Sequence, residues 1–135
     1  MKNDPQGIIT TIAERPRDSW PDPERGNVSW FTLFSSDITP TRALSAGVAE
    51  IGQGGSLELH RHDEPEVYYI LEGTGIMSIN GVETTVSPGC AVYIPGNAEH
   101  GIRNEAPPLL RLFYTFPIDC FADVKYRFSK AEAGS

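Results

Sequence analysis

Two histidines, a glutamate and a tyrosine stand at alternating positions on either side of a short turn in the middle of the chain. His60 and His62 precede the turn at residues 63–65, and Glu66 and Tyr68 follow it. In an extended strand every second side chain shares a face, so two strands joined by this turn would bring the four groups together. Two imidazoles and a carboxylate form a ligand set for a borderline divalent metal such as iron, manganese, nickel, cobalt or zinc.

The remaining histidine extends this set. The sequence contains three His residues, and His100 lies in a second strand-turn-strand pattern, GCAVYIPGNAEHGIRN. A single His is most often a core or surface residue without a ligand role. Three histidines in two units of the same design, with Glu66 in phase, favour a shared site instead. We therefore expect His60, His62, Glu66 and His100 to bind a divalent transition metal.

The two units resemble the two signature motifs of the cupin superfamily. The first unit matches the first motif at every position, as G-x5-H-x-H-x3-E-x6-G from Gly54 to Gly73. The second follows G-x5-P-x-N-x2-H-x3-N from Gly89 to Asn104, with Asn97 where a glycine is usual. Because Asn tolerates a left-handed backbone better than most residues, Asn97 should preserve the turn. The resemblance implies a conical double-stranded β-helix, or jelly roll, with the metal inside its wider mouth.

The elements that must position these side chains are short strands punctuated by Gly, Pro and Asn. Asn80-Gly81 is typical of a two-residue hairpin turn, and no segment before Phe116 has a helical period. Such a pattern describes an all-β antiparallel sandwich or barrel. We expect strands over residues 28–34, 42–51, 56–62, 66–73, 75–80, 82–86, 90–95, 98–104 and 109–116.

The composition predicts a single domain, since 135 residues with 39% apolar side chains can bury a substantial core. Residues 28–128 would form the cupin barrel. Residues 1–27 would supply an edge strand near residues 7–13 and an irregular proline-rich loop over 15–26. Trp20 in that loop should cap an apolar patch or belong to an interface. Residues 129–135 would form a frayed tail.

Charge and cysteine content limit the partners and the compartment. The net charge of −7 argues against nucleic acid or an anionic membrane as a partner, because proteins bind both through clustered Lys and Arg. Residues 1–15 lack the features of a signal peptide and no apolar run is long enough to span a membrane, so a cytoplasmic protein is expected. Cys90 and Cys120 should then be reduced. Because cupins of this size often pair through an outer sheet, we also expect a homodimer.

A closer resemblance connects residues 43–128 with the small single-domain cupin lyases that cleave dimethylsulfoniopropionate (DMSP) to dimethyl sulfide and acrylate. The segments AEIGQGGSLELHRH, GNAEH and FPIDCFADVKY carry it, whereas the loop at 16–26 has no counterpart. The family's metal ligands match the three histidines and Glu66, its proposed base matches Tyr68, and a second active-site tyrosine matches Tyr126. The implied reaction is a β-elimination, in which the metal binds the substrate carboxylate and Tyr68 removes a proton from the adjacent carbon.

Several alternatives remain open at this point. Tyr68 could instead pack in the barrel, and Arg103 and Arg111 could meet a carboxylate or face solvent. The chain could also be another cupin metalloenzyme, such as an iron dioxygenase or a sugar or keto-acid isomerase, or a non-catalytic metal or small-ligand binding protein. Further aromatic residues could help Tyr126 to hold a sulfonium cation, although strand aromatics usually serve the core. These are Trp30, Phe31, Tyr93, Phe113 and Tyr114.

Overall fold

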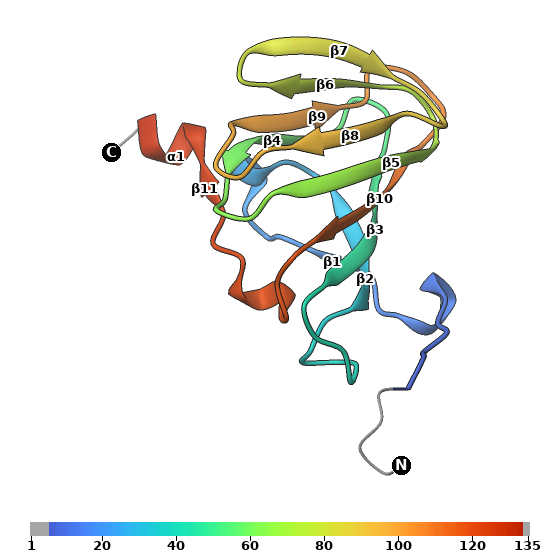
Figure 1. Ribbon diagram of the computed structural model, residues 1–135. Coiled ribbons are helices and arrows are strands. Elements are labelled where there is room, and N and C mark those ends of the chain that lie inside the picture. The colour runs from blue at the N-terminus through green and yellow to red at the C-terminus, as the bar shows by residue number, and fades with distance from the viewer. Residues whose placement is uncertain (1–5, 134–135) are drawn as a thin grey trace.

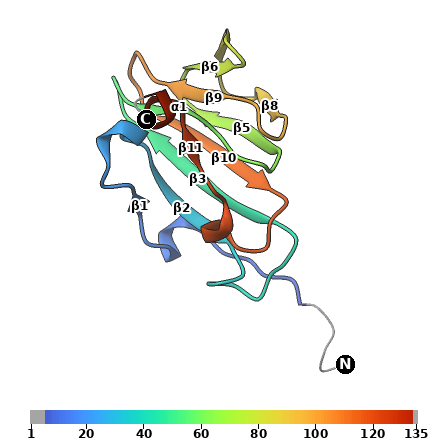
Figure 2. The same ribbon diagram turned by 90° about the vertical axis from the view of Figure 1, so that its left-hand side faces the viewer.

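The computed structural model describes residues 6–133, in which two antiparallel sheets enclose a shared core (Figure 1). The larger sheet has the order β1 (Asp18–Ser19), β2 (Ser29–Phe34), β3 (Ser45–Ile51), β10 (Leu110–Phe116), β5 (Glu66–Glu72), β8 (Ala91–Ile94). The other has the order β11 (Arg127–Phe128), β4 (Ser56–Arg61), β9 (His100–Arg103), β6 (Gly75–Ile79), β7 (Val82–Val86). Strands β2, β3, β10 and β5 run side by side in Figure 2. Each of the nine strands predicted between residues 28 and 116 is present, within three residues of its expected ends.

Alternation along the strands explains why the interior of the barrel is apolar. In β10, Leu110, Leu112, Tyr114 and Phe116 are buried, and the residues between them are half-buried. In β5, Glu66, Tyr68 and Ile70 are buried, and the residues between them are exposed. One face of each strand therefore enters the core, as a period of two requires. The same alternation carries Glu66 and Tyr68 into the interior.

The two asparagines predicted to occupy tight turns do so. Asn80 and Gly81 have φ angles of 49° and 83°, and the hairpin between β6 and β7 closes around them. Asn97 has a φ of 64°, so it takes the left-handed conformation for which glycine is usual in the motif. The turn before β9 is thus preserved despite the substitution.

The prediction for the N-terminal segment was wrong in part. Residues 7–13 form no strand; instead Ile12–Glu14 is a 3-10 helix (η1), and the short edge strand is β1, paired with β2. Apolar residues in this segment do not alternate, and Ile9 is 99% exposed, so no single face could pack on the sheet. The expected loop also contains a 3-10 helix, η2 (Pro23–Arg25).

The segment expected to form a frayed tail begins with a helix that the sequence did not predict. Ser129–Ala133 forms a short helix, α1, and residues 134–135 lie outside the described part of the chain. The Ser129 hydroxyl donates a hydrogen bond to Glu99, and Lys130 Nζ lies 2.8 Å from a carboxylate oxygen of Glu58. These contacts tie the helix to the smaller sheet. In residues 6–133 no helix is long and apolar enough to cross a membrane, and both cysteines are free thiols.

Asn104, the last residue of the second motif, joins the end of β3 to the loop before β10. Its side-chain Nδ2 donates to the carbonyls of Ile51 (3.0 Å) and Pro108 (3.1 Å), and its Oδ1 accepts from Ala106 N at 3.2 Å. The side chain is fully buried. We expect Asn104→Ala to lower the free energy of unfolding by about 2–4 kcal/mol in urea denaturation, because buried backbone groups lose their partners. The control Gln53→Ala, at an exposed position, should change it by less than about 0.5 kcal/mol.

Candidate metal centre

Three histidines and a glutamate meet inside the barrel, where strands of the two sheets face each other. His60 is in β4 with His62 just beyond its end, His100 is the first residue of β9, and Glu66 is the first residue of β5. Residues His60 and His100 are direct cross-strand partners. One ring nitrogen from each histidine lies within 4.8 Å of the others, and all three side chains are buried. The three histidines could therefore hold a metal ion.

Backbone carbonyls orient all three imidazoles. Nδ1 of His60, His62 and His100 lies 2.7, 2.9 and 2.9 Å from the carbonyl oxygens of residues 58, 64 and 98. A carbonyl can only accept, so each Nδ1 carries a proton. In neutral His60 and His100 the Nε2 then keeps a free lone pair, whereas Nε2 of His62 faces the Glu66 carboxylate, a contact that raises the pKa of His62. Nε2 of His60 and of His100 is buried and has no hydrogen-bond partner among the described residues. Because buried polar atoms without partners are costly, this donor set fits a bound cation.

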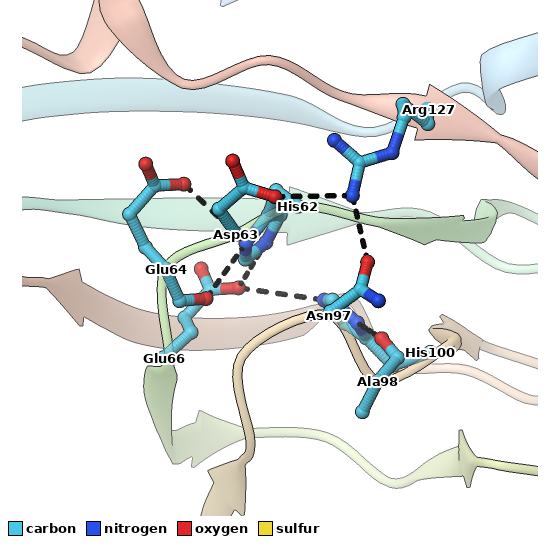
Figure 3. A network of polar contacts seen from close by, with 8 residues as sticks. All are labelled: His62, Asp63, Glu64, Glu66, Asn97, Ala98, His100 and Arg127. Atoms are coloured by element: carbon cyan, nitrogen blue, oxygen red, sulfur yellow. Dashed lines mark hydrogen bonds and ion pairs between the residues drawn. The ribbon is translucent and has the colours of Figure 1, made fainter.

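Glu66 supplies negative charge beside the imidazoles, as Figure 3 shows. Its Oε1 lies 3.1 Å from Nε2 of His62 and 3.5 Å from Nε2 of His100. Burial alone would raise the pKa of Glu66, but its contacts with the two histidines outweigh burial and lower it. Burial above all, with His100 close by, lowers the pKa of His60 to about 3, so its imidazole is neutral at pH 7. A neutral imidazole next to an ionised carboxylate is the state that metal coordination requires.

Hydrogen bonds connect the turn that follows His62 with the turn that precedes His100. Arg127 of β11 donates to Asp63 Oδ1 (3.2 Å) and to Asn97 Oδ1 (2.7 Å), so one side chain spans both turns (Figure 3). The amide of Asn97 also donates to the carbonyl of His62 at 2.7 Å. The first and second units are thereby fixed with their imidazoles pointing inward.

Two tyrosines reach the centre from different elements. The ring of Tyr68 on β5 lies 6.5 Å from that of His100, and the ring of Tyr126, just before β11, lies 5.2 and 5.3 Å from those of His60 and His62. Burial and the Glu66 charge raise the pKa of both hydroxyls well above 10. Both residues line a cavity that also contacts His60 and Glu66. Tyr68 and Tyr126 are thus beside the histidine cluster.

Aromatic side chains form much of the wall of this cavity. Trp20 packs against Trp30 and Tyr126, with ring centroids 4.7 and 5.1 Å apart, so it caps the apolar interior. Tyr114 also lines the cavity, whereas Tyr93 is 65% exposed outside the barrel, and Phe31 and Phe113 are not among the lining residues. Phe121 lines it too and was missed by the sequence reasoning, although it lies in the FPIDCFADVKY segment that carries the family resemblance.

Comparison with known proteins places this arrangement in a family. The family model described as "Cupin domain" matches residues 47–116, which include both histidine units. The chain belongs to the cupin family. In line with that assignment, it is all-β and forms a single domain of two antiparallel sheets.

Relatives of this cupin include an enzyme and a binding protein. Dimethylsulfoniopropionate lyase DddW of Ruegeria pomeroyi is 42% identical over 114 residues, which cover 84% of this chain and 74% of the lyase. The oxalate-binding protein of Thermotoga maritima is 30% identical over 81 residues, 59% of this chain and 67% of that protein. The structure of the polyketide cyclase RemF from Streptomyces resistomycificus superposes with a TM-score of 0.78, covering 92% of this chain and 86% of RemF, at 18% identity. At that identity the likeness concerns the fold alone.

Arg103 and Arg111, whose roles the sequence left undecided, form ion pairs away from the histidine cluster of this cupin. Arg103 pairs with Glu83 at 2.5 Å, and Arg111 pairs with Glu50 at 2.7 Å and Glu72 at 3.0 Å. Neither lines the cavity beside the histidines. Their side chains therefore face carboxylates of the protein rather than the candidate metal centre.

Proposed function

We propose that this cupin is a lyase that cleaves DMSP to dimethyl sulfide and acrylate. The observation that carries this proposal is the 42% identity to a DMSP lyase over 84% of the chain, a span that includes the buried histidine cluster. Identity at this level over most of both chains favours shared chemistry, although a fold by itself would not.

In this proposal His60, His62, Glu66 and His100 hold a divalent transition metal: iron, manganese, nickel, cobalt or zinc. The open Nε2 atoms and the ionised carboxylate support that assignment. When bound, such a cation would hold the substrate carboxylate and acidify the protons on the carbon next to it. These four residues leave room in the coordination shell for that carboxylate.

Tyr68 would act as the base. Its hydroxyl lies on the inward face of β5, two residues beyond Glu66, so it shares the cavity with the cluster. In the protein alone burial raises its pKa, but a positive charge at the cluster would favour the phenolate. The phenolate takes the proton from the carbon next to the carboxylate, the electron pair of that bond forms the carbon–carbon double bond, and the carbon–sulfur bond breaks to release neutral dimethyl sulfide.

Tyr126 and the aromatic wall would receive the other end of the substrate. The sulfonium is a cation with apolar methyl groups, and aromatic faces attract such cations. Tyr126 packs against Trp20 at 5.1 Å and against Phe121 at 6.3 Å between ring centroids. This cluster would hold the sulfonium group beside the histidines and keep water away from the leaving group.

The test is a sealed-vial assay of metal-loaded protein with DMSP, with the gas phase measured for dimethyl sulfide. The expected result is dimethyl sulfide and acrylate in equal amounts, at the same rate with and without oxygen, because elimination consumes no oxidant. Oxygen-dependent product would favour a dioxygenase instead. Absence of product with every metal tried would favour a binding protein.

We also propose that the protein is a homodimer in the cytoplasm, paired through the outer face of the larger sheet. Val67, Tyr69 and Leu71 on β5 and Tyr93 on β8 are exposed there, with Val67 directly opposite Tyr93. Contiguous exposed apolar side chains favour an interface. Light scattering at micromolar concentration should give twice the chain mass, and Tyr93→Lys should shift it towards the monomer. Val82→Lys, at a similarly exposed position on the other sheet, should remain dimeric.

A further inference from the structure

Another cavity lies on the far side of the aromatic wall. It has a volume of about 330 Å³, and Trp30 and Phe121 line both this cavity and the one beside the histidines. The two rings stand edge to face with centroids 6.0 Å apart, so they form the partition between the cavities. We call this space the outer cavity. Its polar lining includes Arg15, Asp18, Thr32 and Asp37.

Arg15 is an unpaired cation in the outer cavity. Its Nε is buried and has no hydrogen-bond partner, and no carboxylate lies within 4.0 Å of its guanidinium in residues 6–133. Arg17, Arg103 and Arg111, by contrast, are all ion-paired. A guanidinium binds a carboxylate in a two-point contact, and a partly buried one without a partner lacks that compensation. Arg15 is therefore suited to an anionic group of a ligand.

The same cavity also has groups that suit a cation. Asp37 accepts a hydrogen bond from the Ser35 hydroxyl, and this bond lowers the pKa of Asp37, which is therefore ionised at pH 7. Asp18 on β1 adds a second carboxylate, and the partition rings Trp30 and Phe121 add aromatic surface. Carboxylates together with aromatic faces attract onium groups. One cavity thus offers a site for each end of a small zwitterion.

The inner cavity is too small, as it stands, for a ligand larger than a few water molecules. Its volume of about 30 Å³ compares with about 330 Å³ for the outer cavity, so a larger ligand requires its wall to move. Most of the wall belongs to hydrogen-bonded strands, but Phe121 begins a three-residue 3-10 helix, η3 (Phe121–Asp123), outside both sheets. The amide of Phe121 donates to Ser35 Oγ at 2.8 Å, which ties this helix to the turn that carries Asp37. Phe121 is therefore the part of the partition with the least support from the sheets.

We propose that the outer cavity binds a small zwitterion that carries a carboxylate and a sulfonium or quaternary ammonium group, and that it is the entrance to the metal cavity. Arg15 holds the carboxylate, the acidic and aromatic side chains hold the onium group, and Phe121 moves to let the ligand pass. That the ligand is DMSP rests on the proposed function. That the ligand is a zwitterion rests only on the charged and aromatic residues that line the outer cavity.

Binding can be measured without turnover. Glycine betaine has a carboxylate and a quaternary ammonium group but no sulfonium to eliminate, and calorimetric titration of the metal-loaded protein gives its Kd. Arg15→Gln should raise that Kd about tenfold, because one charge-assisted contact is lost. Arg42→Gln removes the same charge at an exposed position that lines neither cavity, and should leave the Kd unchanged. Arg15→Lys, which keeps the charge, should recover part of the affinity.

Steady-state kinetics with DMSP test whether the outer cavity is the entrance to the metal cavity. Arg15→Gln should lower kcat/KM about tenfold, mainly through KM, because the contact is made before the substrate reaches the reacting groups. Equal behaviour of Arg15→Gln and Arg42→Gln in both experiments overturns the proposal. If Arg15→Gln weakens betaine binding but leaves kcat/KM unchanged, the outer cavity is not the entrance to the metal cavity. If the wild-type protein does not cleave DMSP but binds betaine in an Arg15-dependent manner, the proposed reaction fails and the zwitterion site stands.

Discussion

Tyr68→Phe is expected to lower kcat for DMSP cleavage by about 10²–10⁴-fold while the protein keeps its metal, because a positioned general base contributes an effect of that size. The substitution removes one oxygen atom and leaves the ring in place. Tyr68 is 2% exposed and its ring centroid lies 6.5 Å from that of His100, so loss of the hydroxyl alone should leave the histidine cluster in place. The loss should therefore appear in kcat and not in metal content.

Tyr69→Phe is the matched control for this experiment. It removes a hydroxyl from the next residue of the same strand, but Tyr69 faces outward and is 46% exposed. Metal content by elemental analysis and dimethyl sulfide release should both equal those of the wild type. If metal-loaded Tyr68→Phe cleaves DMSP at a rate close to normal, Tyr68 is not the base. Tyr126, whose ring lies 5.2 and 5.3 Å from the rings of His60 and His62, would then be the next candidate.

The strands and the histidine cluster could be predicted because both follow from regular alternation. A period of two places His60, His62 and Glu66 on inward faces as soon as the strands and the turn between them are recognised. Asn97 could be placed in a left-handed turn because few other residues accept that conformation. In each case the information lies within a few neighbouring positions of the sequence.

The N-terminal segment and the aromatic wall could not be predicted in the same way. Residues 7–13 contain enough β-branched side chains for a strand, but no alternation assigns them a face, and η1 forms instead. Trp20 and Phe121 reach the cavity from irregular segments about 100 positions apart in the sequence, so no local pattern relates them. The hydrogen bonds that orient the imidazoles use backbone carbonyls, which carry no residue-specific signal.

His100→Ala is expected to reduce metal affinity by more than about 100-fold, because even outer-shell partners of metal ligands contribute 10- to 100-fold. The chain contains three histidines, and all three are in the cluster, so no other imidazole can replace the lost one. In the metal-free protein the same change removes a buried Nε2 that has no partner in the described structure, which partly offsets the cavity left by the ring. The variant should thus fold without metal but lose the metal-dependent part of its stability.

Thermal unfolding with and without metal separates these two effects. A ligand at 100 times its Kd stabilises the native state by about 2.7 kcal/mol, so added metal should raise the Tm of the wild type and leave that of His100→Ala unchanged. Glu99→Gln is the matched control, since Glu99 precedes His100 but binds Arg61 and Ser129 outside the centre. It should retain one metal ion per chain after dialysis. If His100→Ala also retained one ion per chain, the histidine cluster would not be the metal centre, and the elimination chemistry proposed for it would lose its basis.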